Sequence, residues 1–249
     1  MGDTRLHYIQ RGKGNKKILL IHGNMGSIKW WEPMMDALED QYAMLAVDLR
    51  GYGQSPDGKM VVSLQDHVND LTHVMKDLDF SPCVVVGHSL GGAVAMQMAT
   101  SCPDLLTGMV LVDAPSLKGL NGTDYTILET ILSNDDMLVA SLRMTVVAPV
   151  DDTYFSKLVA DCLRGKAALI SNTRALESLE FQKVASQFTK PVLIVHGELD
   201  SLIPVAVAEE TATCYPQAKL HIISGVGHNP QIENTPAFVQ LLGGFLQSF

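Results

Sequence analysis

Short apolar runs alternate with longer amphipathic stretches along most of the chain. The apolar runs are rich in β-branched residues, which suit a pleated and partly buried surface, and they predict strands. These strands are expected at Leu6–Gln10, Lys17–Ile21, Ala43–Leu49, Cys83–Val86, Gly108–Val112 and in the segments PVLIV and KLHIIS. A Gly-Lys-Gly-Asn turn separates the first two, so they are predicted to form a β-hairpin.

The amphipathic stretches predict helices. Leu64, Val68, Leu71 and Met75 recur at helical spacing, which places them on one buried face. Further helices are expected at Trp31–Leu38, Leu90–Thr100, Val205–Thr213 and Pro236–Phe249. Helices that alternate with continuously apolar strands are typical of α/β proteins, in which a mostly parallel sheet is covered by helices on both faces.

Residues 116–178 interrupt this alternation. They are helical in character, they contain no convincing interior strand, and they fall between two predicted core strands. We therefore expect one α/β core, residues 1–115 and 179–249, with a small helical lid inserted at 116–178. The apolar residues of the lid have two interpretations: they pack the lid onto the core, or some of them line an apolar pocket. These residues are Met137, Leu138, Leu142, Met144, Val146 and Val147.

Composition narrows the class of protein. Hydrophobic residues make up 47% and charged residues 18% of the 249, as in folded globular proteins. No apolar run approaches the ~18 residues of a membrane span, and the polar first residues do not resemble a secretory signal. Four widely spaced cysteines argue against a zinc site or disulfides, and a net charge of −9 argues against nucleic acid as a partner. We expect a cytoplasmic protein that binds neither membranes nor nucleic acid.

The segment VVVGHSLGG, residues 84–92, is the first that indicates chemistry. An apolar strand ends there in Ser89, which is flanked by Gly87, Gly91 and Gly92 and is followed by a helix. Glycines beside a serine at a strand-to-helix turn are typical of a nucleophile elbow, which exposes the hydroxyl near backbone N–H groups. A helix N-cap is the alternative role of Ser89, but it does not require the glycines.

A nucleophilic serine needs a base and an acid that orients the base. His228, in the loop VGHNP after the last predicted strand, is the candidate base. Asp200, in HGELDSLIP after another core strand, is the candidate acid, and the order Ser89, Asp200, His228 is that of this type of site. A solvated histidine and a helix-capping aspartate are the alternative roles of the last two. Asp113, at the end of a strand, is the substitute acid.

The oxyanion that forms during acyl transfer needs two backbone N–H donors. Leu90, directly after the serine, supplies one, and Asn24 in the loop IHGNMGS supplies the other, with Met25 as the alternative. Trp30 follows this loop and is expected to reach the substrate pocket. The pocket is predicted to include Met25, Trp30, Leu138, Leu142 and Met144.

As a set and in this order, several segments resemble landmarks of the α/β-hydrolase superfamily, in its small, lidded form. They are HGNMGSIKWW, DLRGYGQS, GHSLGG, LVDAP, PVLIVHGELDSLIP and GVGHNPQIENTPAF. The resemblance covers residues 6–115 and 179–249, and it implies an eight-stranded sheet, the triad Ser89, Asp200 and His228, and an oxyanion hole from Asn24 and Leu90. In such enzymes the lid usually determines the substrate.

The residues therefore predict a serine hydrolase that cleaves a small-molecule carboxylic ester or lactone through an acyl-enzyme, without a metal or organic cofactor. A serine nucleophile disfavours dehalogenases and epoxide hydrolases, because an alkylated serine is an ether that water does not readily cleave. Hydrolysis of C–C bonds in diketone-like acids stays open, with Arg143, Arg164 or Arg174 of the lid as carboxylate partners. Amide hydrolysis, perhydrolysis and a ligand receptor with a slow triad are further alternatives. The oligomeric state is left open.

Overall fold

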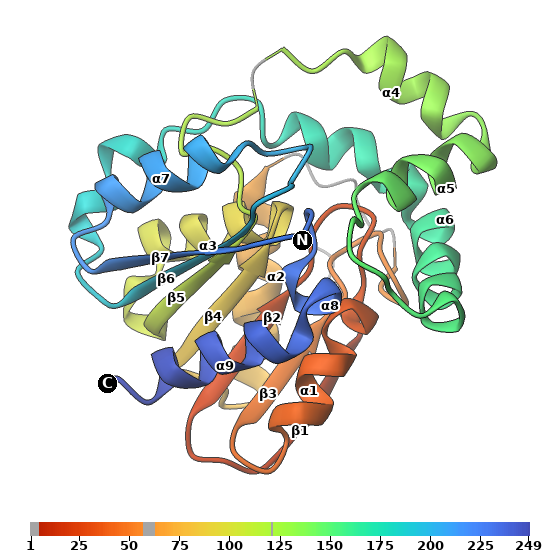
Figure 1. Cartoon of the computed structure of the whole chain (residues 1–249). Helices are drawn as coiled ribbons and strands as arrows, with labels where there is room; N and C mark the ends of the chain where they lie inside the picture. The colour runs from red at the N-terminus through yellow and green to blue at the C-terminus, as the bar shows by residue number, and fades with distance from the viewer. Residues whose placement is uncertain (1–4, 57–62, 121) are drawn as a thin grey trace.

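One sheet of seven strands forms the centre of the molecule in this computed structural model, which describes residues 5–56, 63–120 and 122–249 (Figure 1). The strand order is β1-β3-β2-β4-β5-β6-β7. The strands are β1 (Tyr8–Arg11), β2 (Lys17–Ile21), β3 (Ala43–Val47), β4 (Cys83–His88), β5 (Leu106–Val112), β6 (Val192–Gly197) and β7 (Ala218–Ile223). Strands β2 to β7 are mutually parallel, so the predicted α/β class is confirmed. The expected eighth strand is not among the described residues, and it rested on the resemblance alone, because the hydrophobic pattern itself predicted seven strands.

The predicted hairpin of β1 and β2 is wrong. Strand β1 pairs antiparallel with β3, with Arg11 opposite Met44, and β2 lies on the other side of β3. Four of the five β2 residues are fully buried, whereas every β1 residue keeps some exposure, so β2 takes an interior position and β1 the edge. The turn between them passes close to the entry of β3: a Cβ at Gly12 would lie 2.0 Å from the carbonyl oxygen of Tyr42.

Helices cover both faces of the sheet (Figure 1). Along β2, Ile18 and Leu20 face one layer and Leu19 and Ile21 face the other, as the two-residue period of a strand requires. The first layer contains α1 (Glu32–Leu38) and α9 (Thr235–Leu246), and the second contains α2 (Leu64–Asp77), α3 (Leu90–Ser101) and α7 (Val205–Cys214). The shorter elements are η1 (Ile28–Trp31), η2 (Pro103–Leu105), η3 (Phe181–Lys183), η4 (Ala185–Gln187) and α8 (Pro230–Glu233).

Three further helices, α4 (Tyr125–Leu132), α5 (Asp135–Met144) and α6 (Asp152–Arg174), lie between β5 and β6 in the sequence and beyond the carboxyl ends of the strands in space (Figure 1). Each begins after a polar side chain that caps its first N–H groups: Asp124, Asn134 and Asp151. Helix α4 has no buried residue. Apart from residue 121, which is not described, the segment 116–178 contains no strand. No helix of the described chain has both the length and the apolar character of a membrane span.

Candidate active site

Ser89 lies at a sharp turn between β4 and α3. Its backbone φ of 50° and ψ of −116° are rare for a residue with a side chain, and such a conformation costs on the order of 1–3 kcal/mol. The flanking glycines make the turn possible: a Cβ at Gly87 would lie 2.1 Å from the carbonyl oxygen of Gly91, and one at Gly91 would lie 2.1 Å from that of Ile21. Glycine is therefore required at these two positions for steric reasons, as the sequence indicates.

Asp200 and His228, which lie in the loops after β6 and β7, form a close pair. His228 Nδ1 is 2.7 Å from Asp200 Oδ2, and the other carboxylate oxygen of Asp200 accepts the N–H groups of Leu202 and Ile203. Burial raises the pKa of Asp200, but the hydrogen bond and charge of His228 outweigh it, and the resulting pKa is about 2. Asp200 is therefore ionised at neutral pH and orients the imidazole through Nδ1.

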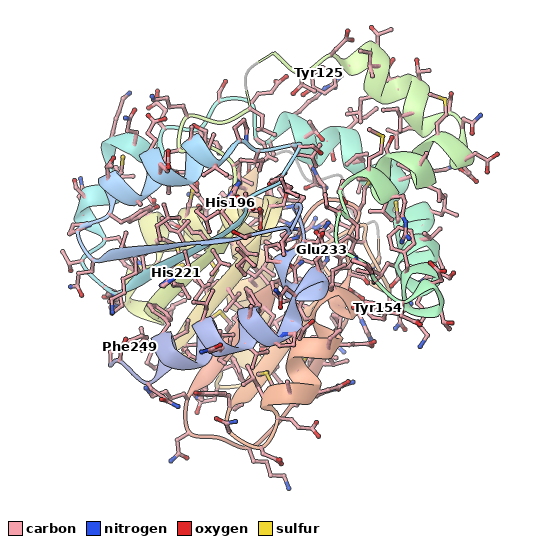
Figure 2. All side chains as sticks on the ribbon, viewed as in Figure 1. Tyr125, Tyr154, His196, His221, Glu233 and Phe249 are labelled. Carbon is pink, nitrogen blue, oxygen red and sulfur yellow. The ribbon has the colours of Figure 1, made fainter. Side chains whose placement is uncertain are left out.

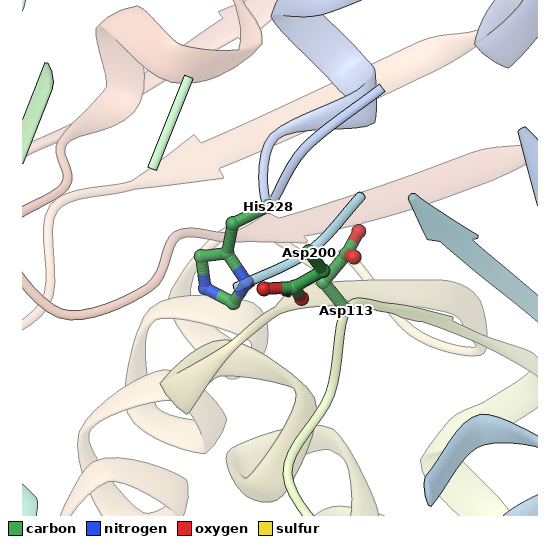
Figure 3. A group of neighbouring side chains, drawn as sticks. All are labelled: Asp113, Asp200 and His228. Atoms are coloured by element: carbon green, nitrogen blue, oxygen red, sulfur yellow. Dashed lines mark hydrogen bonds and ion pairs between the residues drawn. The ribbon is translucent and has the colours of Figure 1, made fainter. Parts of the chain in front are cut away.

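Asp113, the substitute acid, lies beside this pair (Figure 3). Its side chain is fully buried, and its Oδ1 accepts the N–H of Gly197 at 3.0 Å. Burial, together with the charge of Asp200, raises the pKa of Asp113 well above its usual value. The three side chains also place one potential metal ligand each within 4.8 Å of one another, but an ion there would compete for the Nδ1 and Oδ2 atoms that already bond Asp200 to His228.

His88, the residue before Ser89, contacts His228 and holds its backbone. The two rings lie 4.9 Å apart, and His88 Nε2 is 2.8 Å from the carbonyl oxygen of His228. Burial, followed by the charge of His228, lowers the pKa of His88 to about 3. His88 is therefore neutral and donates from Nε2 to that carbonyl. This role of His88 is not predicted from the sequence, in which the residue appears only as part of the nucleophile elbow.

Glu233, the last residue of α8 (Figure 2), also holds the loop of His228. Its carboxylate accepts four backbone N–H groups at 2.7–3.0 Å. Two belong to Gly227 and Asn229, on either side of His228, and two belong to Val147 and Ala148, in the α5–α6 connection. His228 N–H also donates to the carbonyl of Thr145 at 3.0 Å. The segment before α6 and the histidine loop are thus joined into one unit.

The loop after β2 passes directly against the serine. A Cβ at Gly23 would lie 2.8 Å from the Cβ of Ser89, so Asn24 follows within the site itself. Asn24 and Met25 both line the cavity in front of Ser89, and Leu90 begins α3 directly after the serine. Tyr52 donates to Asn24 Oδ1 at 2.8 Å and fixes its side chain.

Ser89 and His228 share a cavity of about 420 Å³ beneath α4, α5 and α6. Its walls are mostly apolar, and no Asp, Glu, Lys or Arg is among the described residues that line it. Such a site favours a neutral, apolar ligand. The lining residues are Asn24, Met25, Trp30, His88, Ser89, Leu120, Gly122, Thr123, Leu128, Leu142, Thr145, Leu169, Thr173, Leu176, Leu202, Ile203, His228 and Asn229.

The predicted pocket residues divide into two groups. Met25, Trp30 and Leu142 line the cavity, and the Trp30 ring stacks on His88 at 5.9 Å. Leu138 is fully buried and is not among the described residues that line the cavity, but it packs in one cluster with Trp30 and Leu142, which do line it. Met144 is 74% exposed, so its assignment to the pocket is corrected. It lies two residues after Leu142, which turns its side chain to the opposite face of the helix.

Part of the cavity wall is formed by residues that were not predicted from the sequence. Leu169, Thr173 and Leu176 recur at helical spacing along and just beyond α6, a pattern that would have identified one lining face. Leu120 and Leu128 come from irregular or short segments whose position depends on the tertiary fold.

The three arginines of the segment 116–178 have partners outside the cavity. Arg143 lies over the ring of Phe155 and 3.6 Å from Asp152, Arg164 pairs with Asp161, and Arg174 lies over the ring of Tyr125. None of the three lines the cavity. They therefore offer no partner for a carboxylate-bearing substrate bound there.

A parallel sheet in this order, with a serine at the turn after β4 and an aspartate–histidine pair in the loops after β6 and β7, defines an α/β-hydrolase. A family model described as serine aminopeptidase, S33, matches residues 12–235. The chain belongs to this family, and the prediction that it is a hydrolase is confirmed at this level.

Individual relatives share less than 30% of their residues with this chain. The chain is 28% identical to a pimeloyl-[acyl-carrier protein] methyl ester esterase of Aliivibrio salmonicida, covering 98% of this chain and 97% of that protein. It is 29% identical to the dihydrolipoyllysine-residue acetyltransferase component of the acetoin cleaving system of Cupriavidus necator, covering 96% of this chain but only 65% of that protein. The enol-lactonase of Burkholderia xenovorans shares the fold, with a TM-score of 0.88 at 20% identity over 98% of this chain and 97% of that one.

Proposed function

We propose that this hydrolase cleaves carboxylic esters or lactones through an acyl-enzyme on Ser89, and that its substrates are apolar and carry no charged group. The observation that carries the proposal is the 2.7 Å contact of His228 Nδ1 with the ionised Asp200. His228 lines the same apolar cavity as Ser89. The helices α4 to α6 act as the lid of this site, and the rest of the chain is the catalytic core.

The reaction proceeds in two acyl transfers. His228 Nε2 accepts the proton of Ser89 Oγ as this oxygen bonds to the carbonyl carbon, and Asp200 stabilises the imidazolium through Nδ1. The N–H groups of Asn24 and Leu90 bind the tetrahedral oxyanion. The C–O bond to the alcohol then breaks, and the alcohol leaves with the proton from His228. Water, deprotonated by His228, then attacks the acyl carbon, the bond from that carbon to Ser89 Oγ breaks, Oγ takes back the proton from His228, and the acid is released.

The neutral class of substrate follows from the lining of the cavity. A free carboxylate in an apolar site would lose its hydration without gaining a cation, which costs several kcal/mol. The relatives named as a methyl ester esterase and an enol-lactonase support ester and lactone bonds as targets. The positions of Arg143, Arg164 and Arg174 speak against the C–C hydrolase alternative, whose substrates carry a carboxylate.

Trapping the intermediate tests the chemistry. Wild-type protein mixed with p-nitrophenyl butyrate and quenched in acid should carry a butyryl group on the peptide that contains Ser89, detected by mass spectrometry, and should release many equivalents of p-nitrophenol. The Ser89→Ala variant should do neither. A single burst without turnover would favour the receptor alternative, and a butyryl group on another residue would refute the proposed nucleophile.

A matched pair of esters tests the substrate class. Dimethyl pimelate and monomethyl pimelate have the same chain, but only the second carries a free carboxylate at pH 7. We expect kcat/KM to be at least ~10-fold higher for the dimethyl ester, since burying an unpaired charge costs more than the ~1.4 kcal/mol that this ratio represents. Equal values, or a preference for the monoester, would overturn the assignment of a neutral substrate.

A further inference from the structure

Tyr52 is a buried tyrosine beside the site that the mechanism above does not use. It lies in the loop after β3, its side chain is 1% exposed, and it is not among the residues that line the cavity. Its hydroxyl donates to Asn24 Oδ1 at 2.8 Å and accepts from Asn172 Nδ2 at 3.3 Å. A buried hydroxyl with one donor and one acceptor contact is well satisfied, and it fixes the groups on both sides.

The chain of contacts continues into the core. Asn172 belongs to α6, is fully buried, and also donates to the carbonyl of Ala168 at 2.9 Å. Its Oδ1 is 2.6 Å from Nε2 of His67 in α2. Burial lowers the pKa of His67 to about 4, so this ring is neutral at pH 7 and donates from Nε2. The hydroxyl of Tyr52 thus connects Asn24 to two helices through groups that have little freedom.

The ring of Tyr52 is equally constrained. Gly165 of α6 allows it to approach the helix, because a Cβ there would lie 2.5 Å from the Tyr52 Cδ1 atom. On another side, the centroid of the His22 ring lies 5.5 Å from that of the Tyr52 ring, with the two ring planes at 85°. His22 Nε2 in turn accepts the N–H of Leu49, at the start of the same loop. Neither the ring nor the hydroxyl can shift without moving α6 or the loop.

We infer that Tyr52 is a positioning residue for the oxyanion site: its hydroxyl holds the side chain of Asn24, and thereby aims the backbone N–H of Asn24 at the oxyanion. This inference rests on the proposed function, in which Asn24 is an oxyanion donor. The side chain of Asn24 is also held by α6 directly, since its Nδ2 donates to Thr173 Oγ1 at 3.4 Å. The oxyanion site is therefore built partly on α6, a helix of the lid, and its geometry depends on where that helix is seated.

The Tyr52→Phe variant removes one oxygen atom and leaves the ring in place. Because loss of an oxyanion donor costs about 100- to 1,000-fold in kcat, misalignment of a donor that stays present should cost about 10-fold. KM for p-nitrophenyl butyrate should change less than twofold. The Kd of phenylboronic acid, which mimics the tetrahedral intermediate on Ser89, should rise by about the same factor as kcat falls. Tyr215→Phe is the matched control: Tyr215, at the end of α7, is also buried, but its ring packs on Phe188.

A double-mutant cycle separates positioning from a general structural effect. In an Asn24→Ala background the side chain that Tyr52 holds is gone, whereas the backbone N–H remains. Adding Tyr52→Phe there should lower kcat less than twofold further, and additive losses would overturn the inference. If wild-type protein forms no acyl-enzyme at Ser89, the proposed function and the positioning role fall together. If acylation proceeds but Tyr52→Phe matches Tyr215→Phe, only the positioning role falls.

Discussion

The bonds of Glu233 lead to a prediction about the loop of His228, the proposed catalytic base. In Glu233→Gln, the amide oxygen can replace Oε2, which accepts from Val147, Ala148 and Gly227, but the amide nitrogen then faces the N–H of Asn229. Three bonds to a charged acceptor become neutral, at about 1 kcal/mol each, and one buried N–H is left unsatisfied, at about 1–3 kcal/mol. Relief of the desolvated charge offsets part of this loss, so we expect a net loss of about 3 kcal/mol.

For a protein of this size, that loss corresponds to a fall in Tm of about 6–12 °C. Thermal unfolding followed by circular dichroism at pH 7 measures it, and kcat on p-nitrophenyl butyrate should fall with KM little changed, because His228 loses its alignment. Glu198→Gln is the control: Glu198 is exposed and accepts a single N–H, from Gly225 at 3.0 Å. Equal effects of the two substitutions on Tm and kcat would refute the reasoning.

Three further predictions concern the acid, the buried histidines and the acyl pocket. Asp200→Asn should lower kcat by on the order of 1,000-fold, whereas Asp113→Asn should cost less than ~5-fold, since burial and the charge of Asp200 already raise the pKa of Asp113 and an amide oxygen can still accept the N–H of Gly197; the reverse result would reassign the acid. Between pH 6.5 and 5 the free energy of unfolding should fall by about 2 kcal/mol for each of His67 and His88. Their folded pKa values, about 4 and about 3, lie below 6.5, so the unfolded state binds the additional protons; a constant stability over this range in urea titrations would contradict this. For methyl esters, kcat/KM should rise about fourfold per added methylene from acetate to butyrate, since each is worth ~0.8 kcal/mol, and a flat series would exclude an apolar acyl site.

Local patterns predict much of this molecule. The strand, turn and helix around Ser89 are encoded in nine consecutive residues, because glycine at tight contacts and β-branched residues in a buried strand act at short range. The loops of Asp200 and His228 follow apolar strands, and parallel strands bring their carboxyl ends to one edge. The pairing of these two side chains follows from that topology.

Contacts between distant segments are less predictable. The partner of β1 depends on which strand needs burial on both sides, and adjacency in sequence points to the wrong neighbour. In the sequence Glu233 is an ordinary polar residue, because its role depends on two N–H groups of the distant α5–α6 connection. Met144 differs from Leu142 only in the side of the helix it occupies, which hydrophobicity alone does not distinguish.

Helix α4 offers a practical opportunity for enzyme engineering. It contributes Leu128 to the cavity wall, yet it buries no residue of its own. Substitutions along it therefore carry a small thermodynamic penalty, while a change at Leu128 alters the volume of the cavity in front of Ser89. Libraries restricted to residues 125–132 should yield many folded variants with shifted chain-length preference, whereas the same number of substitutions in α6 would remove the contacts of Asn172 with Tyr52 and of Thr173 with Asn24.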